Sequence, residues 1–162
     1  MMKNELRCVN NGNGFSYHVL SNGTPAYVQR YDLVEDFHEG FAAVRQDGKW
    51  FHIRVDGSPA YPERYDWVVD FHEGLALVKQ DGKFFHIFSN GTLAYTSRYD
   101  LAGDFYEGFA LVSQDGKWFH ILSNGTSAYP ERYDWVGHFH EGLARVGQDG
   151  KWFHIRFDGT EV

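Results

Sequence analysis

The sequence contains one cysteine, four prolines and no long apolar run, and these shortages exclude several classes of protein. Cys8 has no second cysteine to pair with, which excludes a fold held together by internal disulfides. No apolar run approaches the roughly 18 residues that a membrane-spanning helix needs, and the stretch from Met1 to Leu6 lacks the apolar core of a signal peptide. We therefore expect a cytoplasmic protein that does not enter a membrane.

The chain is also short of positive charge. Its 162 residues include 15 lysines and arginines against 22 aspartates and glutamates, a formal net charge of -7. This excess of negative charge repels nucleic-acid phosphates and anionic lipids, and no cluster of basic residues reverses it locally. We expect no nucleic-acid partner and no binding to a membrane surface.

What the sequence does contain is an internal repeat of 34 residues, rich in aromatic side chains. Three motifs mark it: Gln-Asp-Gly-Lys begins at Gln46, Gln80, Gln114 and Gln148; Tyr-Asp at Tyr31, Tyr65, Tyr99 and Tyr133; and Glu-Gly at Glu39, Glu73, Glu107 and Glu141. A weaker copy opens the chain. We expect a single repeat domain over residues 1–162, with units of about 5–38, 39–72, 73–106, 107–140 and a partial unit, 141–162.

Each unit has the pattern of an antiparallel β-hairpin. Asp-Gly between two apolar segments favours a tight turn with positive φ at both residues. The predicted register pairs Gln80 with Lys83, Val78 with Phe85 and Ala76 with Ile87. Alternation then places Ala76, Val78, Phe85 and Ile87 on a packed face, and puts Leu75, Leu77, Lys79, Phe84, His86 and Phe88 on a wetter one.

A third strand is predicted over residues 65–71, and the prolines lie in the connectors between hairpins. The fold class that follows is all-β: a tandem array of five antiparallel hairpin units, forming an open solenoid or curved stack. The alternative is a closed, five-bladed, propeller-like ring.

The motifs Glu-Gly-Leu-Ala-Leu-Val, Asp-Gly-Lys-Trp, Tyr-Pro, Tyr-Asp and Phe-x-Glu-Gly together resemble the WG (KWG) repeat family of mostly bacterial β-rich repeats. The resemblance extends from about Leu6 to Gly159. Where that family has Trp-Gly-Tyr-Ile, this chain has Trp50-Phe51-His52-Ile53, so the glycine that names the family is a phenylalanine here. The resemblance implies an all-β array that serves as an interaction surface, with no catalytic residues to carry over.

Nine histidines and many repeated carboxylates raise the question of chemistry. A metal site needs several ligands converging on one ion, and acid-base catalysis needs one cleft with unlike environments. A residue that recurs once in every unit is instead typical of a structural role. We therefore expect no enzyme, no catalytic residue, no metal site and no cofactor.

The aromatic residues of the second hairpin strand are the remaining candidates for a binding surface. The predicted partner- or glycan-binding residues are Trp50, His52, Trp118, His120, Trp152 and His154. If these side chains are exposed, they form a repeating aromatic row. If they pack between units instead, the binding surface is expected around Tyr61, Tyr95 and Tyr129.

These observations predict a non-catalytic interaction module that presents a repetitive, aromatic-rich surface to a protein partner. The alternative is a lectin-like glycan binder with one shallow site in each repeat.

Overall fold

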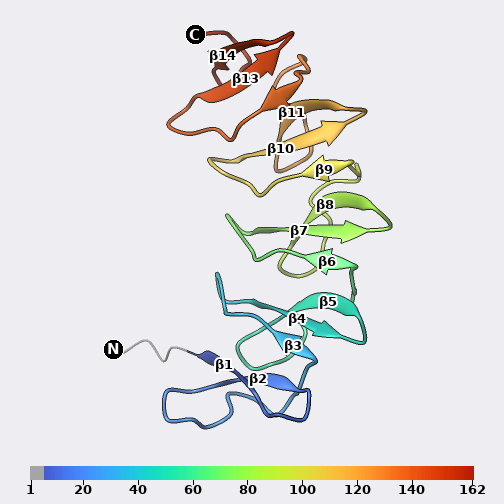
Figure 1. Cartoon of the computed structure of the whole chain (residues 1–162), viewed down its shortest axis with the longest axis vertical. Coiled ribbons are helices and arrows are strands. Elements are labelled where there is room, and N and C mark those ends of the chain that lie inside the picture. The colour runs from blue at the N-terminus through green and yellow to red at the C-terminus, as the bar shows by residue number, and fades with distance from the viewer. Residues whose placement is uncertain (1–5) are drawn as a thin grey trace.

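The computed structural model describes residues 6–162, and it shows an open column of five antiparallel β-sheets (Figure 1). The first predicted unit begins at residue 5, outside the described residues. The amino-terminal sheet lies at one end of the column and the carboxy-terminal sheet at the other. The predicted all-β open stack is therefore confirmed.

The first sheet has two strands, and each of the other four sheets has three. The strands are β1 (Arg7–Asn10) and β2 (Ser16–Val19); β3 (Leu33–Val34), β4 (Ala42–Gln46) and β5 (Lys49–Ile53); β6 (Trp67–Val68), β7 (Leu75–Gln80) and β8 (Lys83–Phe88); β9 (Leu101–Ala102), β10 (Phe109–Gln114) and β11 (Lys117–Leu122); β12 (Trp135–Val136), β13 (Ala144–Gln148) and β14 (Lys151–Ile155). From residue 6 onward the chain contains no helix at all, and so none that is long and apolar enough to cross a membrane.

The predicted hairpins form with the predicted register. Strand β7 pairs with β8 through Gln80 and Lys83, Val78 and Phe85, and Ala76 and Ile87. At the turn between them φ is 52° at Asp81 and 79° at Gly82. Asp-Gly supplies this turn in each of the three-stranded sheets because few residue pairs tolerate two positive φ angles in succession.

The packed face of the hairpin is the core of each unit, as predicted. Ala76, Val78 and Ile87 are fully buried, and Phe85 is nearly so. The same four positions are buried in the hairpin of β4 and β5. These side chains belong to one continuous core cluster that runs through the stack, so each unit is stabilised by its neighbours.

Neighbouring sheets are joined by a short backbone bridge. The N–H of Trp50, in β5, donates to the carbonyl of Tyr65 at 2.8 Å, and the N–H of Tyr65 donates back to Trp50 at 2.9 Å. Equivalent pairs follow at each later step, up to Trp118 and Tyr133. The bridge fixes where each connector enters the next sheet.

The predicted third strand over residues 65–71 is wrong in its length, because β6 contains only Trp67 and Val68. The backbone next to it has another partner: the carbonyl of Val69 accepts a hydrogen bond from the His52 side chain of the preceding sheet. The chain then turns at Glu73-Gly74. Alternation of apolar and polar residues predicts which way side chains point, but it cannot show that a backbone carbonyl such as that of Val69 bonds outside its own sheet.

Candidate functional site

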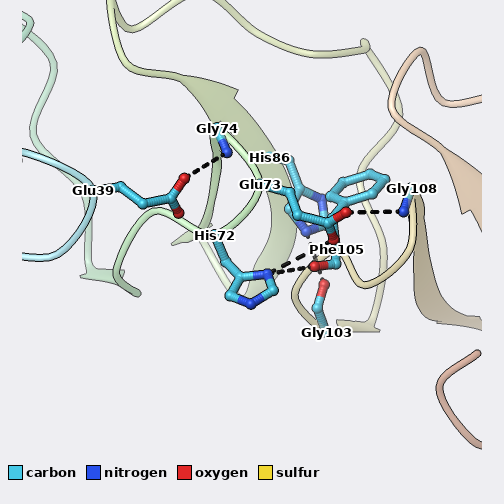
Figure 2. Close-up of polar contacts among 8 residues, drawn as sticks. All are labelled: Glu39, His72, Glu73, Gly74, His86, Gly103, Phe105 and Gly108. Atoms are coloured by element: carbon cyan, nitrogen blue, oxygen red, sulfur yellow. Dashed lines mark hydrogen bonds and ion pairs between the residues drawn. The ribbon is translucent and has the colours of Figure 1, made fainter. Parts of the chain in front are cut away.

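Four of the five repeated histidines are buried between successive sheets, and none of these four is more than 1% exposed. In each case one ring nitrogen meets a tyrosine hydroxyl nine residues later, and the other meets a backbone carbonyl seventeen residues later. For His52 these partners are Tyr61 Oη at 2.6 Å and the carbonyl of Val69 at 2.8 Å. Figure 2 shows His86 beside its carbonyl partner, Gly103. We call this arrangement the histidine clamp; its members are His18, His52, His86 and His120.

The partners of the clamp determine its protonation state. A carbonyl can only accept, so Nε2 carries the proton, and Nδ1 accepts from the tyrosine hydroxyl. Burial lowers the pKa of His52, His86 and His120 to about 4, because the charged form would lose its hydration. Both nitrogens are used in bonds between connector and sheet, so the clamp is a structural device.

A phenylalanine that follows the first strand of the next sheet covers each clamp histidine. The ring centroids of His52 and Phe71 lie 4.5 Å apart, and those of His86 and Phe105 4.6 Å apart. Phe71 and Phe105 are each only 1% exposed. The imidazole is therefore enclosed by side chains that come from the next turn of the array.

The six predicted site residues do not share one exposed surface. His52 and His120 are buried, Trp50 and Trp118 are half-buried, and only Trp152 and His154 are exposed. The expected exposed row is therefore wrong for His52 and His120, because the connector of the next unit crosses their end of the hairpin. Tyr61, Tyr95 and Tyr129, around which the alternative surface is expected, are themselves at most 7% exposed. The connector residues beside them, such as Glu63, are exposed, so a surface around these tyrosines stays a prediction.

The turn end of each hairpin presents a different set of side chains. Residues paired across antiparallel strands point to the same face, and one such set of three is repeated in every three-stranded sheet. We call these sets the outer rows: Leu33, Arg45 and Trp50; Trp67, Lys79 and Phe84; Leu101, Ser113 and Trp118; Trp135, Gly147 and Trp152. Their first members come from the short strands β3, β6, β9 and β12.

Large apolar side chains in the outer rows remain in contact with water. The exposed fraction is 44% for Trp67, 48% for Leu101, 43% for Trp135 and 53% for Trp152. Aromatic rings meet across the strands: the centroids of Trp135 and Trp152 lie 5.2 Å apart. Arg145 lies 4.7 Å from the Trp152 ring, within cation–π range.

Sequence reasoning missed Trp67 and Trp135 as surface residues. The available signal was the residue after each Tyr-Asp, which alternates between leucine and tryptophan at Leu33, Trp67, Leu101 and Trp135. Only the register of β6 on β7, which pairs Trp67 with Lys79, shows that this position lies beside the aromatic of the second hairpin strand.

The repeated glutamates connect successive turns (Figure 2). Glu39 Oε1 accepts from the N–H of Gly74, and Glu73 Oε1 from the N–H of Gly108, each at 3.1 Å. His72, at the same corner, lies with Nδ1 2.5 Å from the carbonyl of Phe105. In residues 6–162 no three side chains of His, Cys, Asp and Glu are grouped so that they could hold a metal ion. These carboxylates and His72 thus tie one unit to the next.

Comparison with known proteins identifies a family for this chain. The family described as "WG containing repeat" matches residues 29–50, 56–84, 89–118 and 123–152. Comparison with proteins of curated function gives no match.

Among solved structures, Hsv2 of Kluyveromyces lactis is 12% identical, with a TM-score of 0.53 over 98% of this chain and 59% of that chain. A form of the same protein with loop 6CD replaced by a Gly-Ser linker is 10% identical, with a TM-score of 0.57 over 97% and 62%. BamB from Moraxella catarrhalis is 11% identical, with a TM-score of 0.51 over 97% and 56%. The chain thus spans about three fifths of the length of these β-propeller-like proteins, and the likeness concerns the fold.

The family match covers more than half of the chain and recurs in four successive repeats. These matched segments include the Tyr-Asp, Glu-Gly and Asp-Gly-Lys motifs that build the turns and hairpins of the column. The chain belongs to the WG-containing repeat family.

Proposed function

We propose that the protein is a non-catalytic interaction scaffold that binds a protein partner through the outer rows. The observation that carries this proposal is the repetition of aromatic and apolar side chains at one register in four successive sheets. In three of these sheets the first member of the row is exposed, and Leu33, in the remaining sheet, is half-buried. An extended partner that contacts one row can contact the next in the same way, so weak contacts add along the column.

The chemistry of the rows fits a protein interface. Tryptophan and arginine are enriched among residues that contribute most of the binding energy at interfaces, and Trp135, Trp152 and Arg145 meet in the last sheet. Contiguous apolar surface that stays in water is typical of an interaction site. In the second sheet from the amino end, Arg45 lies 5.9 Å from the Trp50 ring, so the combination of aromatic and cation recurs.

The repeated polar residues support a role without catalysis. Both ring nitrogens of each clamp histidine are engaged, and the repeated glutamates bond to turn N–H groups. A catalytic acid or base must be able to reach a substrate proton, whereas these groups already hold the units together.

The test compares single replacements on and off the rows. Trp67→Ala and Trp135→Ala remove half-exposed rings from two rows, and Val28→Ala removes an apolar side chain that is 88% exposed in a connector. A partner is first identified by affinity capture and then titrated in purified form against each protein. We expect at least about tenfold weaker binding for each tryptophan variant and unchanged binding for Val28→Ala.

The same variants test the lectin-like alternative. On a glycan array, a glycan that binds the wild type and is lost with Trp67→Ala or Trp135→Ala would replace the protein partner as the ligand of the rows. Unchanged affinity of the protein partner for both tryptophan variants would contradict the proposal.

A further inference from the structure

A hollow of about 480 Å³ lies between the hairpin of β10 and β11 and the connectors that flank it. It is in the size range of small-molecule sites. Its wall combines hydroxyl, amide and guanidinium groups with two aromatic rings. The side chains that line it include Ser97, Tyr99, Gln114, Phe119, Ser127 and Arg132.

The hollow exists because one side chain is shorter here than in the other repeats. The position of Ser97 is occupied by Gln29, Glu63 and Glu131 in the equivalent connectors. There, the side chain lies over the glycine of the next turn: a methyl group built on Gly91 would fall 2.8 Å from Glu63 Oε2. The three atoms nearest to a methyl group built on Gly125 all belong to Tyr95, and none belongs to Ser97.

A second difference widens the same place. Ser127 stands where the other connectors have Pro25, Pro59, Leu93 or Glu161, and its hydroxyl accepts from Arg132 Nη2 at 3.1 Å. The amide of Gln114 is exposed, whereas its equivalents in the other three-stranded sheets are half-buried. The remaining wall is built from residues that recur in the other units. The side chains that shape this opening are therefore particular to this one interface between repeats.

The polar groups around the hollow suit a neutral ligand with several hydroxyls. Ser97 and Gln114 each offer both a donor and an acceptor. The Ser127 hydroxyl, which accepts from Arg132 Nη2, can donate to a ligand. Tyr99 and Phe119 close the hollow on one side; each is 5% exposed, and the Arg132 guanidinium lies 3.6 Å over the Phe119 ring. Donors and acceptors side by side match the neighbouring hydroxyls of a sugar.

The hollow suits an anion less well than a neutral ligand. In two of the other connectors a carboxylate, that of Glu63 or Glu131, occupies the equivalent space. In the described part of the chain neither carboxylate accepts a hydrogen bond, so the wall that the repeats share does not provide an anion site. Asp115 lines the hollow with a negative charge, and Lys117 is already paired with Asp134.

From these observations we propose that the hollow binds one neutral mono- or disaccharide per molecule. This site is separate from the outer rows, and it does not depend on the proposed protein partner. It also differs from a lectin with one site in each repeat, because the other three connectors fill the equivalent space with Gln29, Glu63 and Glu131.

The experiment uses the full chain and isothermal titration with glucose, galactose, mannose, N-acetylglucosamine and trehalose, with sodium glutamate as the carboxylate probe. We expect one or more of the sugars to bind with a stoichiometry of one. Ser97→Glu installs the residue found at Glu63 and Glu131, so it should fold normally and weaken sugar binding at least about tenfold. Ser127→Leu, which installs the residue found at Leu93, fills the hollow independently and should have the same effect.

The matched control is Ser123→Ala, a replacement in the same connector at a residue outside the hollow, and it should leave sugar binding unchanged. The proposal is overturned if none of the five sugars binds, if sugar binding is the same in Ser97→Glu and Ser127→Leu as in the wild type, or if glutamate binds in place of the sugars.

Discussion

Acid should destabilise this protein strongly, because three clamp histidines resist protonation in the folded state. The pKa of His52, His86 and His120 is lowered to about 4 in the structure, against 6.5 for an exposed histidine. Above pH 6.5 both folded and unfolded chains carry neutral rings, so the clamps contribute fully. As the pH falls from 6.5 toward 4, the unfolded chain binds protons that the folded chain excludes, and stability is lost.

The size of the effect follows from the two pKa values. Between pH 7.5 and pH 5, each of these histidines should cost about 2 kcal/mol of unfolding free energy, or about 6 kcal/mol for the three together. That loss is comparable to the whole stability of many domains. The pKa of His18 is lowered as well, which adds to the loss in the same direction.

The assay is urea unfolding followed by tryptophan fluorescence at pH 7.5 and pH 5, for the wild type and for His86→Gln. An amide can donate to the Gly103 carbonyl and accept from the Tyr95 hydroxyl, but it does not titrate. Carboxylates titrate alike in both proteins, so the difference isolates His86. The variant should lose about 2 kcal/mol less than the wild type between the two pH values. An equal loss in both proteins would refute the reasoning.

Three further substitutions test individual parts of the structure. Tyr95→Phe removes the hydroxyl that donates to a clamp imidazole and should cost about 1–3 kcal/mol in thermal or urea unfolding; no change would show that the bond is dispensable. Gly91→Ala should destabilise the protein more than Gly82→Ala. Both glycines have positive φ, but only the methyl group added at Gly91 would meet another side chain, that of Tyr61 at 2.6 Å; equal losses of unfolding free energy would contradict the close approach of Gly91 to Tyr61. Asp66→Ala should lower the unfolding midpoint more than Lys49→Ala, because Asp66 also accepts from the Asp81 N–H at the hairpin turn; the reverse order would assign the main role to the ion pair.

Much of the local structure could be predicted from the sequence because it depends on residues close together in the chain. The Asp-Gly turns, the pairing of Val78 with Phe85 and the burial of Ala76 all follow from turn chemistry and period-2 alternation. The chain order of the units was visible from the 34-residue repeat. Phe85, at the position of the glycine that names the family, lies on this predicted packed face and is covered by the Arg98 guanidinium.

The binding surface was harder to predict because contacts between units decide which end of each hairpin face is covered. Alternation places His86 and Phe84 on the same face, yet His86 is fully buried and Phe84 is not. The difference arises because the chain crosses His86 seventeen residues later, where the carbonyl of Gly103 accepts a hydrogen bond from His86 Nε2–H. Trp67 was missed for the same reason: its place beside Phe84 depends on the register of β6, which has only two residues.

The central claim is that the buried histidine clamps hold the column together, while the outer rows stay accessible and bind a partner. It is tested most directly by measuring both unfolding free energy and partner affinity for His86→Gln and Trp67→Ala. The account predicts that His86→Gln is less stable than the wild type at pH 7.5 but binds the partner normally, and that Trp67→Ala stays close to wild-type stability but binds at least about tenfold more weakly. Loss of affinity in His86→Gln with unchanged affinity in Trp67→Ala would contradict it.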